Sequence, residues 1–395
     1  MLGVNYKHGF LYGVISFVIA LMSIWAPLQV WILKVDGAAR MPAFFCFLAL
    51  FIVMASRKRI CTNLTNVYLV LLIYILVNGY YKGGHLAQYH DLPNWKMFWS
   101  LFKTFGYFII VKYALSVDFK YTIKLITYSL LAYCIICLAF GGFSVDRADL
   151  AINANEIALN ASLTYGLVHL NGVYHYQSKL KTFLLSLVPF ITVLMTASRM
   201  GFAIVVFITM FTIIGHSKRK SIRFKFLSVI LCLLVGLCFS LIVSNSEVGA
   251  RYESTLSTTD EYDDLKTGTV LDYLGDRGFQ YYASWNLFCE NPVTGIGFMT
   301  WAKYNPTGHV CHSEYLFQYL ENGLIGFILY CMFLVLIYKQ FKLKANYNGD
   351  KSIMMALFIS ILFADVVLWT YSSFAVFAVF AILSCSSKFN HHSLL

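Results

Sequence analysis

The stretch that decides the fold is "HVCHSEYLFQYLENGLIGFILY", residues 309–330, in which polar residues lead directly into a long apolar run. The hydrocarbon core of a bilayer takes about 20 apolar residues of helix, and similar runs recur along the whole chain. These runs do not alternate with the period of two that a barrel strand requires. Because helices satisfy their own main-chain groups in lipid, we expect an all-α polytopic membrane protein.

The composition supports one integral membrane domain over residues 1–395. Of the 395 residues, 59% are hydrophobic and only 12% are charged, against about 25% charged residues in a soluble domain. The first run, Phe10 to Leu33, follows Lys7 and lacks a convincing cleavage site, so we expect a retained span rather than a signal peptide.

Hydropathy predicts about twelve spans, with an even number returning the carboxyl terminus to the side of the amino terminus. With the amino terminus in the cytoplasm, the basic clusters at 57–59, 218–225 and 339–351 all fall inside. The net charge of +11 then reflects orientation and anionic lipid headgroups, and we expect no nucleic acid partner. The expected spans are 10–32, 41–56, 64–80, 95–117, 121–142, 156–174, 180–197, 199–216, 226–244, 313–338, 352–368 and 371–387.

The longest connection, residues 245–311, joins the ninth and tenth spans on the external, periplasmic side. A long loop in an otherwise economical chain is usually functional. Within it, "YYASWNLF" at 281–288 predicts an amphipathic helix at the membrane interface. Cys289 and Cys311 share this loop and can pair in an oxidising compartment. Cys134 and Cys137 have C-x-x-C spacing but lie inside a span, which favours packing over redox chemistry.

Three arginines are candidates for binding an anion. Arg199, in "TASRMGF", stands between two apolar runs at the external surface; it is either functional or a turn residue reaching the headgroups. Arg277, in the long loop, has the planar, permanent charge that suits a phosphate, although a pair with Asp276 is the alternative. Arg251 is a weaker candidate.

Two histidines and two acidic residues within expected spans complete the candidate set. His312 directly precedes the tenth span, Ser313 can cap the helix, and an imidazole exchanges protons near neutrality. His309 and His312 have a spacing that suits a metal only with further ligands, and we expect no metal. We expect Glu321 to face the bundle interior, where it either orients an arginine or hydrogen-bonds within the bundle. Asp365 is a similar case.

Three stretches taken together resemble the bacterial O-antigen ligase and Wzy-type polymerase superfamily. They are "TASRMGF" at 196–202, "DRG…W…ENPVTGIGF" at 276–298 and "HSEYLFQYLENGLIG" at 312–326, and their order and topological placement match as well. The resemblance covers roughly residues 150–340. The chain departs from the pattern at Ser313, where asparagine is common, and lacks a clear R-x10-G pair in two external loops.

The resemblance implies a metal-independent, inverting glycosyltransferase of the C-type multi-span class that needs no cofactor. It implies a donor glycan on undecaprenyl diphosphate, at the outer face of the bacterial inner membrane. By resemblance, Arg199 and Arg277 bind the diphosphate and His312 positions or deprotonates the acceptor hydroxyl. We expect Arg251, His309, Glu321 and Ser313 to bind substrate. A flippase and a chain-length regulator are possible protein partners.

Polymerase and ligase differ chiefly in the acceptor, which is another lipid-linked repeat unit or the lipid A-core. We favour an O-antigen polymerase, while "RYESTLS" and "ADVVLW" also resemble parts of some ligases and keep a ligase as the alternative. A twelve-span transporter is a third reading. It predicts discontinuous spans near the midplane of the membrane and related halves, and the sequence indicates neither.

Overall fold

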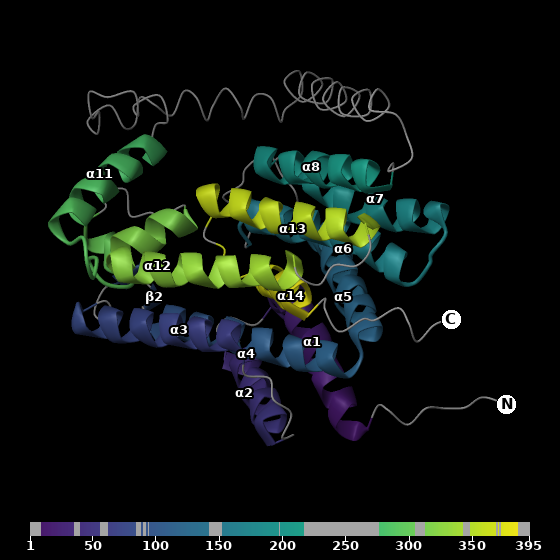
Figure 1. Ribbon diagram of the computed structural model, residues 1–395, viewed down its shortest axis with the longest axis horizontal. Coiled ribbons are helices and arrows are strands. Elements are labelled where there is room, and N and C mark those ends of the chain that lie inside the picture. Colours follow the sequence, from purple (N-terminus) through teal and green to yellow (C-terminus); the bar gives the residue numbers. More distant parts are fainter. Residues whose placement is uncertain are drawn as a thin grey trace.

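The computed structural model describes residues 9–34, 40–55, 62–83, 88–89, 92–93, 95–141, 152–196, 198–216, 276–304, 313–342, 348–368, 370 and 373–385. These residues form a bundle of helices, which confirms the all-α class (Figure 1). The strands among them are the two-residue β1 (Gln88–Tyr89) and β2 (Leu92–Pro93), paired antiparallel.

The helices follow the apolar runs of the sequence, and polar residues mark where several of them begin. The side chains of Thr62, Asp118, Asn153 and Ser178 accept hydrogen bonds from main-chain N–H groups of the first turn. The helices are α1 (Phe10–Pro27) with the π-helical turn η1 (Leu28–Leu33), α2 (Arg40–Ala55), α3 (Asn63–Tyr81), α4 (Trp95–Val117), α5 (Phe119–Phe140), α6 (Ala154–Tyr174), α7 (Lys179–Met195), α8 (Arg199–His216), α11 (Asp276–Glu290), the 3-10 turn η6 (Trp301–Lys303), α12 (Glu314–Lys342), α13 (Asn348–Val367) and α14 (Phe374–Cys385).

The core is centred on α14, which lies in the middle of the bundle (Figure 1). Its residues 375–384 are all buried, as expected for a helix that is apolar on every side. The ring of Tyr68 from α3 stacks between Phe333 of α12 and Phe377 of α14, with centroid distances of 4.8 and 5.3 Å. This aromatic contact ties helices from both ends of the sequence together.

The apolar surface shows that this is a membrane protein. Large hydrophobic side chains point outward, for example Phe51 at 73% exposure and Val77 at 63%, and soluble monomers rarely expose broad apolar patches. Four described helical segments are long and apolar enough to cross a bilayer: Phe10–Leu33, Asn63–Tyr81, Phe119–Phe140 and Glu314–Phe341. The number twelve stays a prediction, and the expected ninth span, 226–244, lies outside the described residues.

The helix expected at 281–288 is confirmed as part of α11, which stands at one end of α12 (Figure 1). Its position at the membrane interface stays a prediction. Ser284 is fully buried, whereas Trp285 is 59% exposed. Cys134 and Cys137 are buried free thiols, which confirms the packing interpretation. Cys289 is an exposed free thiol, so the structure does not show the pairing considered for it; Cys311 lies outside the described residues.

Candidate functional site

The centre of the candidate site is an interruption in α12. The helix is 29 residues long, but Gly323 has φ 63° and ψ −167°, a backbone conformation that is essentially restricted to glycine. An interrupted helix leaves carbonyl groups without partners before the break and N–H groups without partners after it. A buried break is therefore stable only if other parts of the chain supply those partners.

The glycine-rich turn at 291–297 supplies most of them. Its N–H groups donate to carbonyl oxygens before the break, and its carbonyl oxygens accept from N–H groups after it. The four hydrogen bonds are Ile296 N–H to Leu320 O (3.0 Å), Gly297 N–H to Glu321 O (2.8 Å), Leu324 N–H to Pro292 O (2.9 Å) and Ile325 N–H to Val293 O (3.3 Å). The stretch "NPVTGIG" thus occupies the gap in α12 and continues its hydrogen bonding.

Two glycines allow this close approach. A Cβ atom on Gly323 would lie 2.4 Å from the main-chain nitrogen of Gly295 and 2.4 Å from the carbonyl oxygen of Val293. A Cβ atom on Gly295 would lie 2.5 Å from the nitrogen of Gly323. Main-chain atoms cannot rotate away as a flexible side chain can, so both positions require glycine.

Glu321 binds the residues that directly follow the turn at 291–297. It is 2% exposed, and its two carboxylate oxygens accept from the N–H groups of Met299 (2.7 Å) and Trp301 (3.2 Å). Of the two roles expected for this residue, the structure shows hydrogen bonding within the bundle. A direct contact of Glu321 with substrate stays a prediction.

Side chains of helix α3 also hydrogen-bond to main-chain groups at the break and in the turn. The side-chain amide of Asn78 donates to the carbonyl oxygens of Thr294 (2.7 Å) and Glu321 (3.2 Å). The hydroxyl of Tyr74 donates to the carbonyl oxygen of Asn322 (2.9 Å). The sequence analysis missed Asn78 and Tyr74, because they stand in an apolar span without a recognisable motif.

A second polar cluster surrounds the start of α12. Ser313 caps the helix as expected, since its hydroxyl oxygen accepts from the N–H of Leu316 (3.4 Å). The same hydroxyl donates to the carbonyl oxygen of Asp365 at the end of α13 (3.0 Å). The N–H of Glu314 donates to the carbonyl oxygen of Leu368 (3.1 Å). Two successive residues of α12 are therefore attached to the end of α13.

Two buried carboxylates bind the segment that joins α13 to α14. Glu314 accepts from the side-chain amide of Gln318 (2.8 Å) and the N–H of Thr370 (3.1 Å). Asp365 accepts from the hydroxyls of Thr370 and Tyr330, each at 2.6 Å. Asp365 thus hydrogen-bonds within the bundle, the second of its two expected roles.

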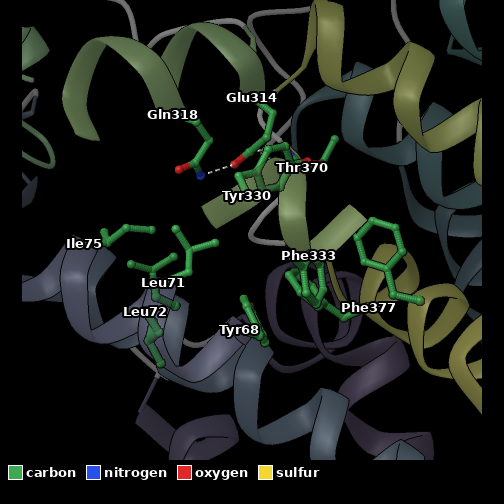
Figure 2. A pocket seen from close by; sticks show the side chains of 12 residues that line it. Tyr68, Leu71, Leu72, Ile75, Glu314, Gln318, Tyr330, Phe333, Thr370 and Phe377 are labelled. Carbon is green, nitrogen blue, oxygen red and sulfur yellow. Dashed lines mark hydrogen bonds between the residues drawn. The ribbon is translucent and has the colours of Figure 1, made fainter. Parts of the chain in front are cut away.

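A small cavity lies below Glu314 (Figure 2). Glu314, Gln318 and Thr370 form its polar side, and apolar residues of α3 such as Leu71 and Ile75 face them. Its volume of about 20 Å³ has room for about one water molecule, so it does not hold a sugar or a lipid chain in this form.

Arg199 is exposed at the first position of α8, where Ser198 caps the helix by accepting from the N–H of Gly201 (3.3 Å). The hydroxyl of Ser198 donates to Asn155 Oδ1 (3.1 Å), and the carbonyl oxygen of Gly201 accepts from the hydroxyl of Ser162 (2.9 Å). The start of α8 is therefore fixed against the first half of α6.

Helix α6 in turn reaches the cluster around Glu314. Asn160 Oδ1 accepts from the hydroxyl of Ser373, which precedes α14 (2.9 Å), and the N–H of Ser373 donates to the carbonyl oxygen of Thr370 (3.0 Å). Thr370 also contacts Glu314. The starts of α6, α8, α12 and α14 and the end of α13 thus meet at one end of the bundle.

The remaining candidate residues are only partly described. Arg277 lies in the first turn of α11, and the structure describes its main chain alone. Arg251, His309 and His312 lie outside the described residues. Convergence of Arg199, Arg277 and His312 on one cavity stays a prediction. In the described part of the chain, no group of three or more His, Cys, Asp or Glu could hold a metal ion.

Comparison with known protein families finds a match over part of the chain. Residues 183–331 match the family described as O-antigen ligase, a segment that runs from α7 into α12 and includes Arg199, the turn at 291–297 and the break at Gly323. No curated protein matches the chain significantly. The match confirms the resemblance to the O-antigen ligase and polymerase superfamily, and members of the matched family are glycosyltransferase-like enzymes.

Proposed function

We propose that this chain, whose residues 183–331 match the O-antigen ligase family, is a Wzy-type O-antigen polymerase. It transfers a glycan from undecaprenyl diphosphate to the end of another lipid-linked repeat unit. One observation supports the proposal: two of the stretches that resemble the family hydrogen-bond directly, and the third is linked to them through α6 and the residues before α14. The turn at 291–297 fills the break in α12, and the starts of α8 and α12 lie at one end of the bundle.

The proposed chemistry is an inverting displacement without a metal. Arg199 and Arg277 bind the diphosphate and stabilise the charge that builds on it as the sugar leaves. Arg199 is exposed at a helix start, where first-turn N–H groups and the helix dipole also favour an anion. His312 positions or deprotonates the acceptor hydroxyl, which attacks the anomeric carbon from the side opposite the leaving diphosphate.

The site is proposed to face the periplasm from the inner membrane. In the twelve-span topology, α6, α8, α12 and α14 begin outside and α13 ends outside. These are the helix ends that meet around Thr370 and Glu314. Residues 245–311 contribute α11 and the turn at 291–297 to the same region.

The transporter reading loses support for a physical reason. The sequence indicated no discontinuous span near the midplane of the membrane. The break in α12 comes after only nine helical residues, and its depth in a bilayer stays a prediction. Transporters use the free main-chain groups of broken helices to bind ions and substrates. Here the turn at 291–297 and α3 occupy those groups. The break serves to hold a loop in place.

An O-antigen ligase is the second candidate, because the matching family carries that description. Deleting the gene and separating surface glycans by gel distinguishes the candidates. Core carrying a single repeat unit indicates a polymerase, long chains stranded on the carrier lipid indicate a ligase, and an unchanged profile with an uptake defect indicates a transporter.

Two substitutions test the proposed chemistry itself. We expect Arg277→Ala and His312→Ala to abolish long glycan chains while the protein stays at wild-type abundance in the membrane. Abundance is measured by immunoblot of the same cells. Normal ladders in both variants would refute the proposal.

A further inference from the structure

We propose that Lys82 and Lys303 bind the diphosphate of the acceptor lipid, at a site separate from the arginines proposed for the donor. The inference rests on the proposed function, because a polymerase, unlike a ligase, takes a second lipid-linked repeat unit as its acceptor. Both lysines stand at the end of α3, next to the turn at 291–297. The proposed topology places this end of α3 outside.

The structure holds both lysine side chains in place. A Cβ atom on Gly297 would overlap the Cβ of Lys82 and lie 3.0 Å from its Cγ, so the stem of this lysine packs directly on the glycine. The Nζ of Lys303, at the end of η6, donates to the carbonyl oxygen of Gly83 (3.3 Å). Because Gly83 follows Lys82 in the chain, the two side chains share one helix end.

The charge of the two lysines exceeds what the end of α3 can balance. Within the described residues, neither lysine forms an ion pair with a carboxylate. Cations do complement the carboxyl end of a helix, which carries about half an elementary negative charge. Two ammonium groups leave an excess of roughly 1.5 positive charges, so this surface attracts an anion.

The neighbouring aromatic residues indicate how deep this surface lies. Tyr81 is 84% exposed, and Tyr304, the residue after Lys303, is 50% exposed. Tyrosine is enriched where the hydrocarbon core meets the lipid headgroups. The lysines therefore lie at the depth of lipid phosphates, whose oxygens accept short hydrogen bonds from ammonium groups.

The residue type also suits an acceptor rather than a donor. Charge builds on the donor diphosphate as the sugar leaves, and the planar fork of arginine can pair with two of its oxygens at once. The acceptor diphosphate does not change during the reaction, so it needs only to be held. A lysine binds phosphate as a point charge and supplies that attraction.

The two proposed phosphate sites lie on different sides of the bundle. Helix α3 packs against α12, α12 against α13, and α13 against α8, which begins with Arg199 (Figure 1). The acceptor reacts at the far end of its glycan, so its diphosphate stays about one repeat unit away from the reacting carbon. Two diphosphates in a single site would also repel each other.

The experiment uses the purified full-length chain in nanodiscs of phosphatidylcholine, which has no net charge. The donor is a lipid-linked chain whose terminal hydroxyl is blocked, so that it cannot act as an acceptor. The acceptor is one repeat unit, either on polyprenyl diphosphate through a bond that cannot be cleaved or on an uncharged polyprenyl ether. Comparing the two acceptors isolates the contribution of the diphosphate.

The test variant combines Lys82→Gln with Lys303→Gln, because glutamine keeps the Cβ and Cγ atoms that pack on Gly297. We expect the diphosphate-acceptor concentration for half-maximal rate to rise about two- to twenty-fold, the range for two exposed ion pairs. The maximal rate and the half-maximal donor concentration should stay within about two-fold. With the uncharged acceptor the variant should match wild type, which also shows that it is folded.

A matched control removes the same charge from another helix end. Lys179→Gln with Lys181→Gln changes the exposed start of α7, which the proposed topology places in the cytoplasm, and it should match wild type with both acceptors. An equal loss with both acceptors, or no loss with either, overturns the acceptor site. A loss that appears only in nanodiscs containing anionic phosphatidylglycerol indicates a phospholipid headgroup and overturns it as well.

The wild-type chain separates these failures from a failure of the proposed function. If wild type extends the diphosphate acceptor, the polymerase stands whatever the lysine variant does. If wild type transfers glycan to lipid A-core and to no lipid-linked repeat unit, the polymerase is overturned, and the acceptor site with it.

Discussion

Replacing Gly323 by alanine tests the docking of the glycine-rich turn into α12. The conformation at φ 63° and ψ −167° costs a residue with a side chain about 1–3 kcal/mol. The new Cβ atom also lies 2.4 Å from the Gly295 nitrogen and the Val293 oxygen, so the turn at 291–297 has to move.

The size of the effect follows from the hydrogen bonds lost. Displacing the turn breaks at least two of its four main-chain hydrogen bonds to α12, and each contributes about 0.5–1.5 kcal/mol. Together with the backbone strain, the expected destabilisation is about 2–6 kcal/mol. Folded proteins are stable by about 5–15 kcal/mol, so this is a large share.

The assay is thermal unfolding of the full-length protein in detergent, followed by size-exclusion chromatography with fluorescence detection. The matched control is Gly13→Ala in α1, where an added Cβ atom meets nothing within 4 Å. We expect Gly323→Ala to unfold at a clearly lower temperature and to lose long glycan chains. If Gly323→Ala matches Gly13→Ala in both measurements, the turn is not seated in the break.

Two further predictions concern the same end of the bundle. Asn78→Ala removes both hydrogen bonds from α3 to Thr294 and Glu321, and it should lower stability by about 1–3 kcal/mol in the same unfolding assay; an unchanged unfolding temperature would contradict the role given to α3. Cys289 is exposed, and the proposed topology places it outside, so a membrane-impermeant maleimide should label it in spheroplasts; labelling only after lysis would place α11 on the cytoplasmic side.

Local features of the structure could be read from the sequence because they depend on neighbouring residues. The expected spans 95–117 and 199–216 coincide with α4 (Trp95–Val117) and α8 (Arg199–His216), because the ends of a helix can be placed where an apolar run begins and ends. The cap at Ser313 follows from a hydroxyl placed directly before an apolar helix. The all-α class could likewise be predicted from the apolar runs alone, without knowing which helices contact each other.

The interruption of α12 could not be read in this way. "ENG" within an apolar run is compatible with a continuous helix, because a single glycine is tolerated there. What breaks the helix is a partner elsewhere, the turn at 291–297, and Asn78 stands 216 and 243 positions away from the residues that it binds. The positions of Gly295 and Gly323 were visible in the sequence, but their contact with each other was not.

The position of Gly323 along α12 also indicates how deep in the bilayer the turn at 291–297 lies. At about 1.5 Å per residue, the apolar part of α12 after the glycine, Leu324 to Tyr338, is roughly 22 Å long, which is shorter than the hydrocarbon thickness of about 30 Å. The part before it adds roughly 14 Å. In the proposed topology, the turn at 291–297 therefore lies toward the outer side of the bilayer rather than at its centre. We expect the diphosphate of the proposed donor lipid at a similar depth in the same leaflet.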